Sequence, residues 1–461
     1  MSHVFTTETR LSEKDAHEIM RYAREYVGEY SRIQRYVWHR IAHDCGRLNQ
    51  AKLNTEIQKR FHVTKRTANS VIFDMKGRYK ALKALKYTEL YELRNKIDHL
   101  VENAEKLAMK VDALKEGAKE NRLSVDQLQT YRNLKKSLFY RHQKIQRYKD
   151  RMLQLQKDID SGSCSIGFGS RKMFRAQYRP DENGYGTHEK WYRDFVRARD
   201  KNIFFLGSAD ETAGNQMFQL TPCDDGTYKI MVRKDSSFVQ GRDKYVYGSC
   251  SFRYLDDELK RSLVLRDRPV SYRFKIRGRK VFLQAVIRMR ATEHPVITTM
   301  MEGAIGIDFN SGHIDIAETD SRGNLTAFRS YKLHFHGTGT KAENEMRQVV
   351  SQIGTYALMK GKSLVKEDLS FVKKKSNTSK RKSRKGKDYN KMLHALDYSR
   401  YEDAIVNMTF RSGIDLIEVN PAYTSKIARQ KYCSSRKIPI HNGAAYVIAR
   451  RGQGFRDKYI A

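Results

Sequence analysis

Acidic side chains, prolines and paired cysteines are scarce in this chain of 461 residues. The 53 Asp and Glu are outnumbered by 89 Lys and Arg, which leaves a formal charge of +36. The five cysteines include no Cys-x-x-Cys pair, which argues against a disulfide framework and against a structural zinc site. There is no run of about 18 apolar residues and no apolar signal core near Met1, so we expect a cytoplasmic protein without a membrane partner.

The charge excess predicts a polyanionic partner. Lys and Arg bind phosphate backbones because neutralised phosphates release condensed counterions. The 27 Tyr and 20 Phe residues offer flat faces for stacking on unpaired bases. A merely basic globular protein is the alternative, and nucleic acid is the better explanation of so large a charge.

The first 179 residues contain no proline, which favours long helices. Apolar residues recur there at spacings of four and three, which is typical of a heptad seam: Leu93, Ile97, Leu100, Ala104, Leu107, Val111 and Leu114. Glu116, Gly117 and Asn121 end this helix, and Ser124 with Gln127 predicts a capping box for the next one. Two antiparallel helices follow, either as a solvated coiled coil or as an arm along a nucleic-acid backbone.

Residues 161–300 are rich in glycine, aromatic and β-branched residues, and they predict a barrel-like β domain. The clearest strands are Val270 to Arg277 and Val281 to Arg290, joined at Gly278. Apolar and basic side chains alternate in the first strand, so one face should be buried and the other charged. The charged face is predicted to bind nucleic acid through Arg273, Lys275 and Arg277.

Beyond Pro295 the apolar pattern predicts eight elements in the order βββαβαβα. Strands are expected at 304–310, 313–320, 324–333, 363–369 and 414–420, and helices near 341–360, 390–411 and 442–452. This order is typical of an RNase H-like fold, a mixed sheet flanked by helices. Between the fourth strand and its helix, nine of the fifteen residues 373–387 are basic and none is acidic. This run is a solvated loop or a clamp on a strand, and its predicted nucleic-acid contacts are Lys373, Lys374, Lys375, Arg381, Lys382, Arg384 and Lys385.

Two acidic positions stand out in this predicted fold. Asp308 lies among apolar neighbours on the first strand, where an unpaired charge is costly. Glu367 lies at the end of the fourth strand, which is adjacent to the first. Folds of this class hold two divalent cations about 4 Å apart between such carboxylates, and Mg2+ or Mn2+ takes oxygen ligands. An acid at a strand end is more often an ordinary surface residue, but the placement of both acids on adjacent central strands favours a site, so we predict Asp308 and Glu367 as metal ligands and catalytic residues.

Several segments together resemble TnpB, a transposon-encoded RNA-guided nuclease related to compact type V CRISPR effectors. The segment 304–310 resembles its first RuvC motif and 365–369 its second, while 442–452 is similar to its third-motif helix. The run Asn-Pro-Ala-Tyr-Thr-Ser at 420–425 resembles the approach to its zinc ribbon, and it is the one segment that is specific by itself. The segments 164–175 and 210–215 extend the similarity over nearly the whole chain.

The resemblance implies an RNA-guided DNA endonuclease of the prokaryotic cytoplasm, associated with the nucleoid. A guide RNA would pair with target double-stranded DNA beside a short flanking motif, and the protein would read backbone shape. The implied layout is an α+β multidomain chain. A helical recognition lobe (11–160) is inserted in a β-barrel wedge domain (1–10 and 161–300), and a RuvC-like nuclease domain (301–461) follows. The guide sequence, the flanking motif and the oligomeric state are not predicted.

Two features depart from the family pattern. The ribbon region near 426–440 is reduced and carries Cys433 alone, so no zinc site is expected. The third acidic ligand should precede Ala444-Ala445 by three residues, and His441 stands there as predicted ligand or base. A nearby acid could restore the charge, the candidates being Asp315, Glu318, Asp320 and Asp457. If the site has decayed instead, the chain would be a cleavage-deficient RNA-guided DNA-binding repressor.

Overall fold

The computed structural model is a mixed helix-and-sheet protein. It describes residues 2–120, 122–211, 214–239, 243–265, 268–290, 294–310, 312–334, 340–368 and 398–457. The chain divides into two units, one of residues 1–3 with 289–461 and one of residues 4–288. No helix in these described ranges has the length and apolar character that crossing a bilayer requires.

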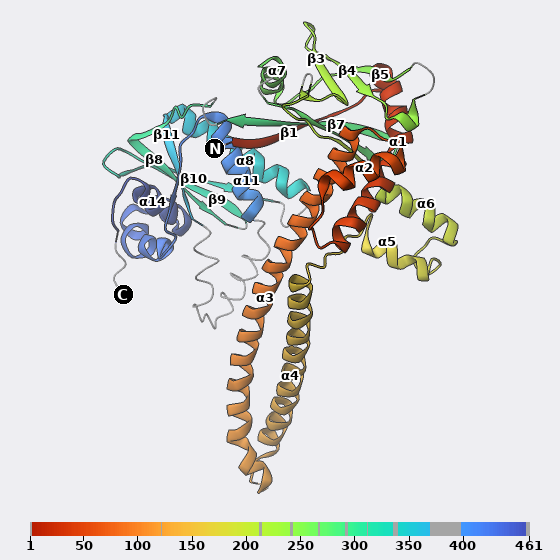
Figure 1. Ribbon diagram of the computed structural model, residues 1–461. Coiled ribbons are helices and arrows are strands. Elements are labelled where there is room, and N and C mark those ends of the chain that lie inside the picture. The colour runs from red at the N-terminus through yellow and green to blue at the C-terminus, as the bar shows by residue number, and fades with distance from the viewer. Residues whose placement is uncertain are drawn as a thin grey trace. The chain divides into compact units, whose positions relative to one another are not determined.

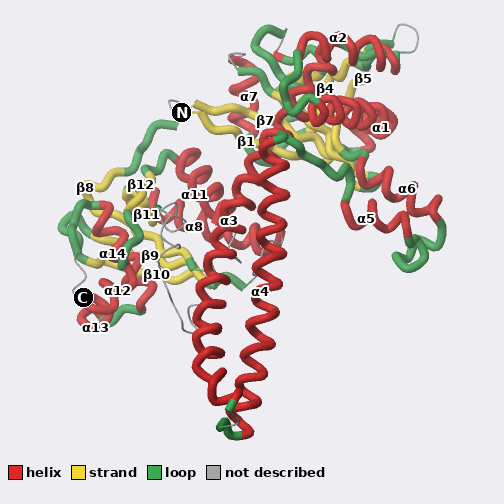
Figure 2. The backbone as a smooth tube through the Cα atoms, turned by 60° about the horizontal axis from the view of Figure 1, so that its bottom comes forward, coloured by secondary structure: helices red, strands yellow, loops and turns green. Residues whose placement is uncertain are grey.

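The second unit begins with four long helices, shown in Figure 1. They are α1 (Glu13–His43), α2 (Gln50–Phe61), α3 (Lys65–Lys119) and α4 (Val125–Asp160). Figures 1 and 2 both show α3 and α4 side by side, and Leu90, Leu93, Leu155 and Ile159 form a shared core. The predicted Ser124–Gln127 capping box is confirmed. The predicted end of the first helix between Glu116 and Asn121 is confirmed, because α3 ends at Lys119 with Glu120 as its C-cap. Gly117 itself is still helical, since glycine lowers helix stability by only about 1 kcal/mol.

The rest of this unit contains two sheets and three short helices. These elements are β1 (Ser2–Arg10), α5 (Arg171–Arg175), α6 (His188–Arg199), β2 (Asn202–Phe205), β3 (Phe218–Pro222), β4 (Tyr228–Arg233), β5 (Tyr245–Cys250), α7 (Asp256–Leu265), β6 (Ser271–Arg277) and β7 (Lys280–Arg290). The strand orders are β1-β7-β6-β2 and β3-β4-β5. In the described residues neither sheet closes, so the predicted barrel is corrected to two open sheets. Helix α1 covers them instead. Gly248 of β5 permits this close packing, because a Cβ atom there would lie 2.9 Å from Cδ1 of Ile19 in α1.

The first unit is built on one five-stranded sheet. Its elements are β8 (Thr299–Phe309), β9 (His313–Thr319), β10 (Leu325–Lys332), α8 (Thr340–Lys360), β11 (Lys362–Glu367), α11 (Tyr398–Ser412), β12 (Leu416–Val419), α12 (Thr424–Ile427), α13 (Cys433–Arg436) and α14 (Ile440–Gly452), with a π-helical turn at Ala428–Tyr432. The strand order is β10-β9-β8-β11-β12. Strand β9 is antiparallel to β8 and β10, whereas β11 is parallel to β8 and β12. The eight elements therefore occur in the predicted order.

The sheet lies between two helical layers. One face packs against α8 and α11 through a core that includes Ile305, Ile307 and Ile316. The other face packs against α14, whose residues Ala444–Ala449 are all buried. Gly306 permits this close packing, because a Cβ atom there would lie 2.0 Å from the carbonyl oxygen of Ala445. Side chains alternate along a strand, so Asp308 follows Gly306 onto the face that α14 covers.

Candidate metal centre

Strand register brings the predicted acids together. Asp308 pairs directly with Asp315 across β8 and β9. In the parallel pair of β8 and β11, Ile307 is opposite Lys366, so Glu367 follows beside Asp308. Val365 lies two residues before Glu367 and contacts Gly452 of α14, which places Glu367 on that same face. Three carboxylates therefore lie on adjacent strands, on the face of the sheet that α14 covers.

The first turn of α14 adds the predicted histidine. Nδ1 of His441 lies 3.2 Å from Oδ2 of Asp308, and the amide of Asn310 donates to the same oxygen at 3.0 Å. The hydrogen bond with Asp308 raises the pKa of His441, although partial burial opposes this shift. Asp308 is almost enclosed, with 12% of its side chain exposed, whereas 43% of His441 remains open to solvent. A substrate could therefore reach the pair from the histidine side.

Glu367 is held and tuned by its surroundings. Burial, followed by the charge of Asp308, raises the pKa of Glu367 from 4.5 to about 7. The hydroxyl of Thr424 donates to Oε1 of Glu367 at 2.8 Å, and this bond together with Arg451 opposes the rise. Two carboxylates that repel each other in a partly enclosed site are a favourable setting for a divalent cation. The oxygens of Asp308 and Glu367 are therefore of the donor type that Mg2+ or Mn2+ takes, and metal binding by these residues stays a prediction.

Of the four acids that could replace a third ligand, one lies at the site. Asp315 contacts Nδ1 of His313 and receives a hydrogen bond from Ser330. Glu318 instead pairs with Lys362 at 2.7 Å on the opposite face of the sheet. Asp320 accepts hydrogen bonds within its own turn, and Asp457 pairs with Arg450 at 2.8 Å.

Three further residues of the site escaped sequence reasoning. His313 is one, and its signal was present, because it precedes Asp315 by two residues on a predicted strand and so shares its face. Thr424 lies in the Asn-Pro-Ala-Tyr-Thr-Ser run that the sequence singled out, but nothing in that run indicated its bond to Glu367. Tyr401 comes from a distant element and gave no signal. Tyr401 stacks on Phe309 with ring centroids 3.8 Å apart. Its buried hydroxyl has no hydrogen-bond partner in the described residues, and burial, Glu402, Asp308 and Glu367 all raise its pKa.

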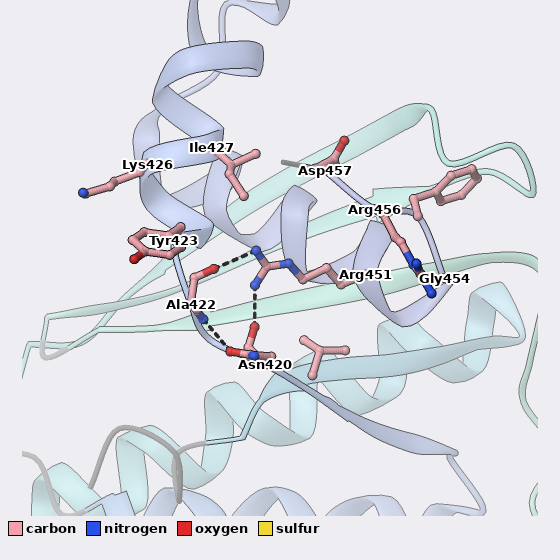
Figure 3. Close-up of a pocket in the computed structure, with 11 residues that line it drawn as sticks. Asn420, Ala422, Tyr423, Lys426, Ile427, Arg451, Gly454, Arg456 and Asp457 are labelled. Atoms are coloured by element: carbon pink, nitrogen blue, oxygen red, sulfur yellow. Dashed lines mark hydrogen bonds between the residues drawn. The ribbon is translucent and has the colours of Figure 1, made fainter. Parts of the chain in front are cut away.

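An open pocket of about 1250 Å³ lies along the segment 419–427, and Figure 3 shows the side chains that line it. The segment 419–427 forms one wall, and the end of α14 with residues 454–457 forms the other. Arg451 holds the two walls together by donating to the carbonyl oxygens of Asn420 and Ala422, the latter at 2.7 Å. Basic and aromatic side chains line the space, namely Tyr423, Lys426, Phe455 and Arg456.

The predicted nucleic-acid residues divide into two groups. Arg273 and Arg277 of β6 lie over the rings of Phe204 and Phe282, at 5.0 and 4.4 Å from the ring centroids. Arg277 also pairs with Glu8 at 3.1 Å, while Lys275 lies between them on the strand. The remaining predicted residues fall outside the described residues: Lys373, Lys374, Lys375, Arg381, Lys382, Arg384 and Lys385. Nucleic-acid contact by either group stays a prediction.

No protein-family model and no curated protein matches this chain. Among solved structures, T. thermophilus RuvC with a Holliday junction substrate matches at a TM-score of 0.23 and 12% identity, over 32% of this chain and 89% of RuvC. A Cas12i–crRNA–dsDNA complex matches at a TM-score of 0.32 and 9% identity, over 78% of this chain and 58% of Cas12i. The Cas12i1 R-loop complex after target DNA cleavage matches at a TM-score of 0.27 and 10% identity, over 81% of this chain and 61% of Cas12i1. The chain spans less than two thirds of both Cas12i proteins, and such remote matches carry no argument about activity.

Proposed function

We propose that this chain is an RNA-guided, metal-dependent DNA endonuclease. The observation that carries the proposal is the convergence of Asp308 and Glu367, from adjacent strands, beside His441 of α14. The sheet order, with its second strand antiparallel, supports an RNase H-like nuclease domain of the RuvC type. The motifs similar to TnpB supply the expectation of a guide RNA.

The residues of the site suit phosphodiester hydrolysis. Bound Mg2+ or Mn2+ ions would supply an activated water and stabilise the leaving oxygen. Asp308 and Glu367 offer the carboxylate oxygens, and Asn310 and Thr424 hold those carboxylates in place. His441 is positioned as a third ligand or as a base for the attacking water.

The pocket beside Thr424 is where a nucleic-acid strand would enter. Lys426 and Arg456 can neutralise phosphates, and the ring of Tyr423 can stack on a base. The partners are then a guide RNA and target double-stranded DNA with a flanking motif, in the prokaryotic cytoplasm near the nucleoid. Residues 11–160 would serve as the recognition lobe, and residues 1–10 with 161–300 as the wedge domain.

A guide-directed binding protein that does not cleave is the second candidate. The feature that favours it is His441, a neutral or cationic group where the related nucleases carry a third acid. Asp315 weakens this alternative, because it restores a third carboxylate on the neighbouring strand. The two candidates differ in one measurement, which is the formation of cleaved DNA.

The test begins with RNA that co-purifies with the full chain. This RNA is sequenced, and a duplex matching its guide segment is incubated with the complex in Mg2+ and then in Mn2+. We expect cleavage by the native complex and a loss of at least about 100-fold in Asp308→Ala, corresponding to about 2.7 kcal/mol of barrier. Binding of the matched duplex should persist in this variant, because Asp308 does not lie in the pocket wall.

Glu343→Ala is the matched control, since Glu343 is an acid of the same unit that pairs with Arg347 on the surface of α8. This variant should cleave like the native complex. Cleavage by Asp308→Ala at the native rate would refute the assigned site. Tight matched binding without products in either metal would establish the binding-only alternative.

A further inference from the structure

Two histidines and an aspartate converge on the edge of the site away from Glu367. His313 and Asp315 share one face of β9, and His441 reaches them from the first turn of α14. One donor atom from each of the three residues lies within 4.8 Å of the other two. The ring centroids of His313 and His441 are 4.7 Å apart, and the ring planes are inclined at 64°. The cluster is therefore formed by rigid elements and not by a loop.

The spacing of these donors is close to what one ion requires. Metal bonds to imidazole nitrogen and carboxylate oxygen are about 2.0–2.2 Å long, so two ligands of one ion lie at most about 4.4 Å apart. The three donor atoms are thus within a few tenths of an ångström of a ligand set. Partial exposure of both histidines allows that adjustment, since 32% of His313 and 43% of His441 are open to solvent.

Neighbouring polar groups hold the carboxylate in position. Ser330 donates to Oδ1 of Asp315, which leaves Oδ2 directed toward His313. Ser330 also lies 3.2 Å from Oδ1 of Asn442, whose amide donates to the carbonyl oxygen of Arg329 at 3.0 Å. Supporting hydrogen bonds of this kind orient the ligands of metal sites.

The chemistry of this donor set differs from that of the two carboxylates. Mg2+ prefers oxygen ligands and retains its water, whereas imidazole nitrogens favour first-row transition ions. Asp308 lies between the two groups, because Oδ2 of Asp308 is 3.2 Å from Nδ1 of His441. One carboxylate can therefore serve both positions.

We propose that His313, Asp315 and His441 form a binding site for a divalent first-row transition ion, next to the oxygen site of Asp308 and Glu367. The inference rests on the proposed function in one respect, because it makes the nuclease site asymmetric, with one hard and one softer metal position. Metal binding itself can be measured whether or not the chain cleaves DNA.

The experiment titrates the metal-free full chain with Co2+ and with Mg2+. Co2+ is followed by its visible ligand-field absorption, which reports nitrogen ligation, and both ions are followed by calorimetry. We expect Co2+ to bind more tightly than Mg2+. In His313→Ala the Co2+ affinity should fall by about 10-fold or more, the smallest loss expected when a ligand group is removed.

His334→Ala is the matched control, because His334 also pairs with a carboxylate, Glu345, in the same unit. Its Co2+ affinity should equal that of the native chain. Circular dichroism tests whether His313→Ala folds. His313→Gln provides a second variant, which retains a polar side chain. Equal Co2+ affinity in the native chain, His313→Ala and His313→Gln would overturn the inference.

The outcomes also separate the two proposals. Co2+ binding that depends on His313 in a chain without any cleavage would retain the metal site and reject the nuclease. Cleavage that depends on Asp308, with Co2+ binding indifferent to His313, would retain the nuclease and reject the transition-ion site.

Discussion

Oδ2 of Asp308 and Nδ1 of His441 lie 3.2 Å apart, joining the end of the central strand to the first turn of the helix that covers it. The carboxylate thereby lies near the amino end of α14, where the helix dipole favours negative charge. Glu367 adds a second acid beside Asp308, and burial, followed by the charge of Asp308, raises the pKa of Glu367. In the metal-free chain the ionised form of Glu367 therefore lowers the free energy of unfolding at pH values above its raised pKa.

The first prediction concerns this pH dependence. Glu367 has a pKa of about 7 in the folded chain, against 4.5 for the free group. The folded chain therefore retains a proton between these values, and the free energy of unfolding falls as the pH rises from about 4.5 to about 7. His441 acts in the same direction, because its raised pKa gives stabilisation that is complete below pH 6.5 and lost above its folded value.

Glu367→Gln isolates the first of these contributions. The amide remains neutral and can still accept the hydrogen bond from Thr424. At pH 8 we expect this variant to be more stable than the native chain by on the order of 2 kcal/mol, and at pH 4 to match it. Chemical denaturation of both metal-free proteins across this range measures the difference. A variant less stable than the native chain at pH 8 would contradict the assigned burial of the charge.

The second prediction concerns the packing of α14 on the sheet. A Cβ atom on Gly306 would lie 2.0 Å from the carbonyl oxygen of Ala445 and 2.5 Å from the amide nitrogen of Ala449, both of them backbone atoms. Gly306→Ala should therefore displace α14 and destabilise the unit by about 3 kcal/mol or more. Hydrogen exchange of the amides in 440–452 should accelerate accordingly.

Gly77→Ala is the control for this substitution. No atom lies within 4 Å of a Cβ at Gly77, which is inside α3. The change should leave exchange in α14 as it is and stabilise α3 by up to about 1 kcal/mol through helix propensity. Unchanged exchange of α14 in Gly306→Ala would show that the helix is not held against β8 as closely as the structure indicates.

Local patterns account for what the sequence predicted well. Strong apolar periodicity between Pro295 and Gly452 predicted the eight main elements in their observed order, because burial on both faces of the sheet leaves little freedom. Strand β8 nevertheless begins before its predicted start, and the short helices α12 and α13 were not predicted. The same pattern located Asp308 and Glu367 on adjacent strands. The roles assigned to these residues remain predictions, since geometry alone does not measure catalysis.

Tertiary contacts explain what the sequence did not predict. Thr424 forms a hydrogen bond with Glu367, which is 57 residues away in the sequence, and no local sequence pattern predicts such a pairing. Sheet closure depends on which strands meet at the edges, so the alternating pattern of 270–277 was equally compatible with a barrel and with open sheets under α1. His313 was predictable, because its two-residue spacing from Asp315 fixes a common face.

The third prediction concerns a buried ion pair on the α8 face of the sheet. Nζ of Lys362 lies 2.7 Å from Oε1 of Glu318, and both residues are less than 10% exposed. Burial alone would raise the pKa of Glu318, but the hydrogen bonds from Lys362 and Tyr356 outweigh it, so the pKa is lowered. The stabilisation is therefore present above pH 4.5 and is lost as the pH falls through the folded value.

Lys362→Met should destabilise the chain by up to about 3–5 kcal/mol at pH 7, because it removes the closest cation from a buried carboxylate and leaves only Tyr356 and the more distant Lys360, at 3.7 Å. Adding Glu318→Leu should recover much of this loss, since an apolar pair replaces a charged one. The free energies of unfolding of the native chain, both single variants and the double variant complete the cycle. Additive single effects would show that the two residues are not energetically coupled.

The last prediction concerns Tyr423 in the pocket of Figure 3. The backbone of Tyr423 is left-handed, with φ of 64°, a conformation that is costly for an aromatic residue and that persists where a site requires it. The residue is 57% exposed, and Nζ of Lys426 lies 5.2 Å from the centroid of its ring. A base stacked on this ring would contribute about 1–3 kcal/mol to binding.

Tyr423→Ala should therefore weaken binding of a labelled single strand by about 5-fold to 150-fold, measured by fluorescence anisotropy on the RNA-loaded chain. Tyr423→Phe keeps the ring and should bind like the native chain. Tyr178→Ala removes a ring that is 75% exposed outside the pocket and should have no effect. The pattern matters more than any single value, because a loss common to all three variants would indicate general damage. A strand held by phosphate contacts alone would instead leave Tyr423→Ala unaffected, and the pocket would then bind the backbone without reading a base face.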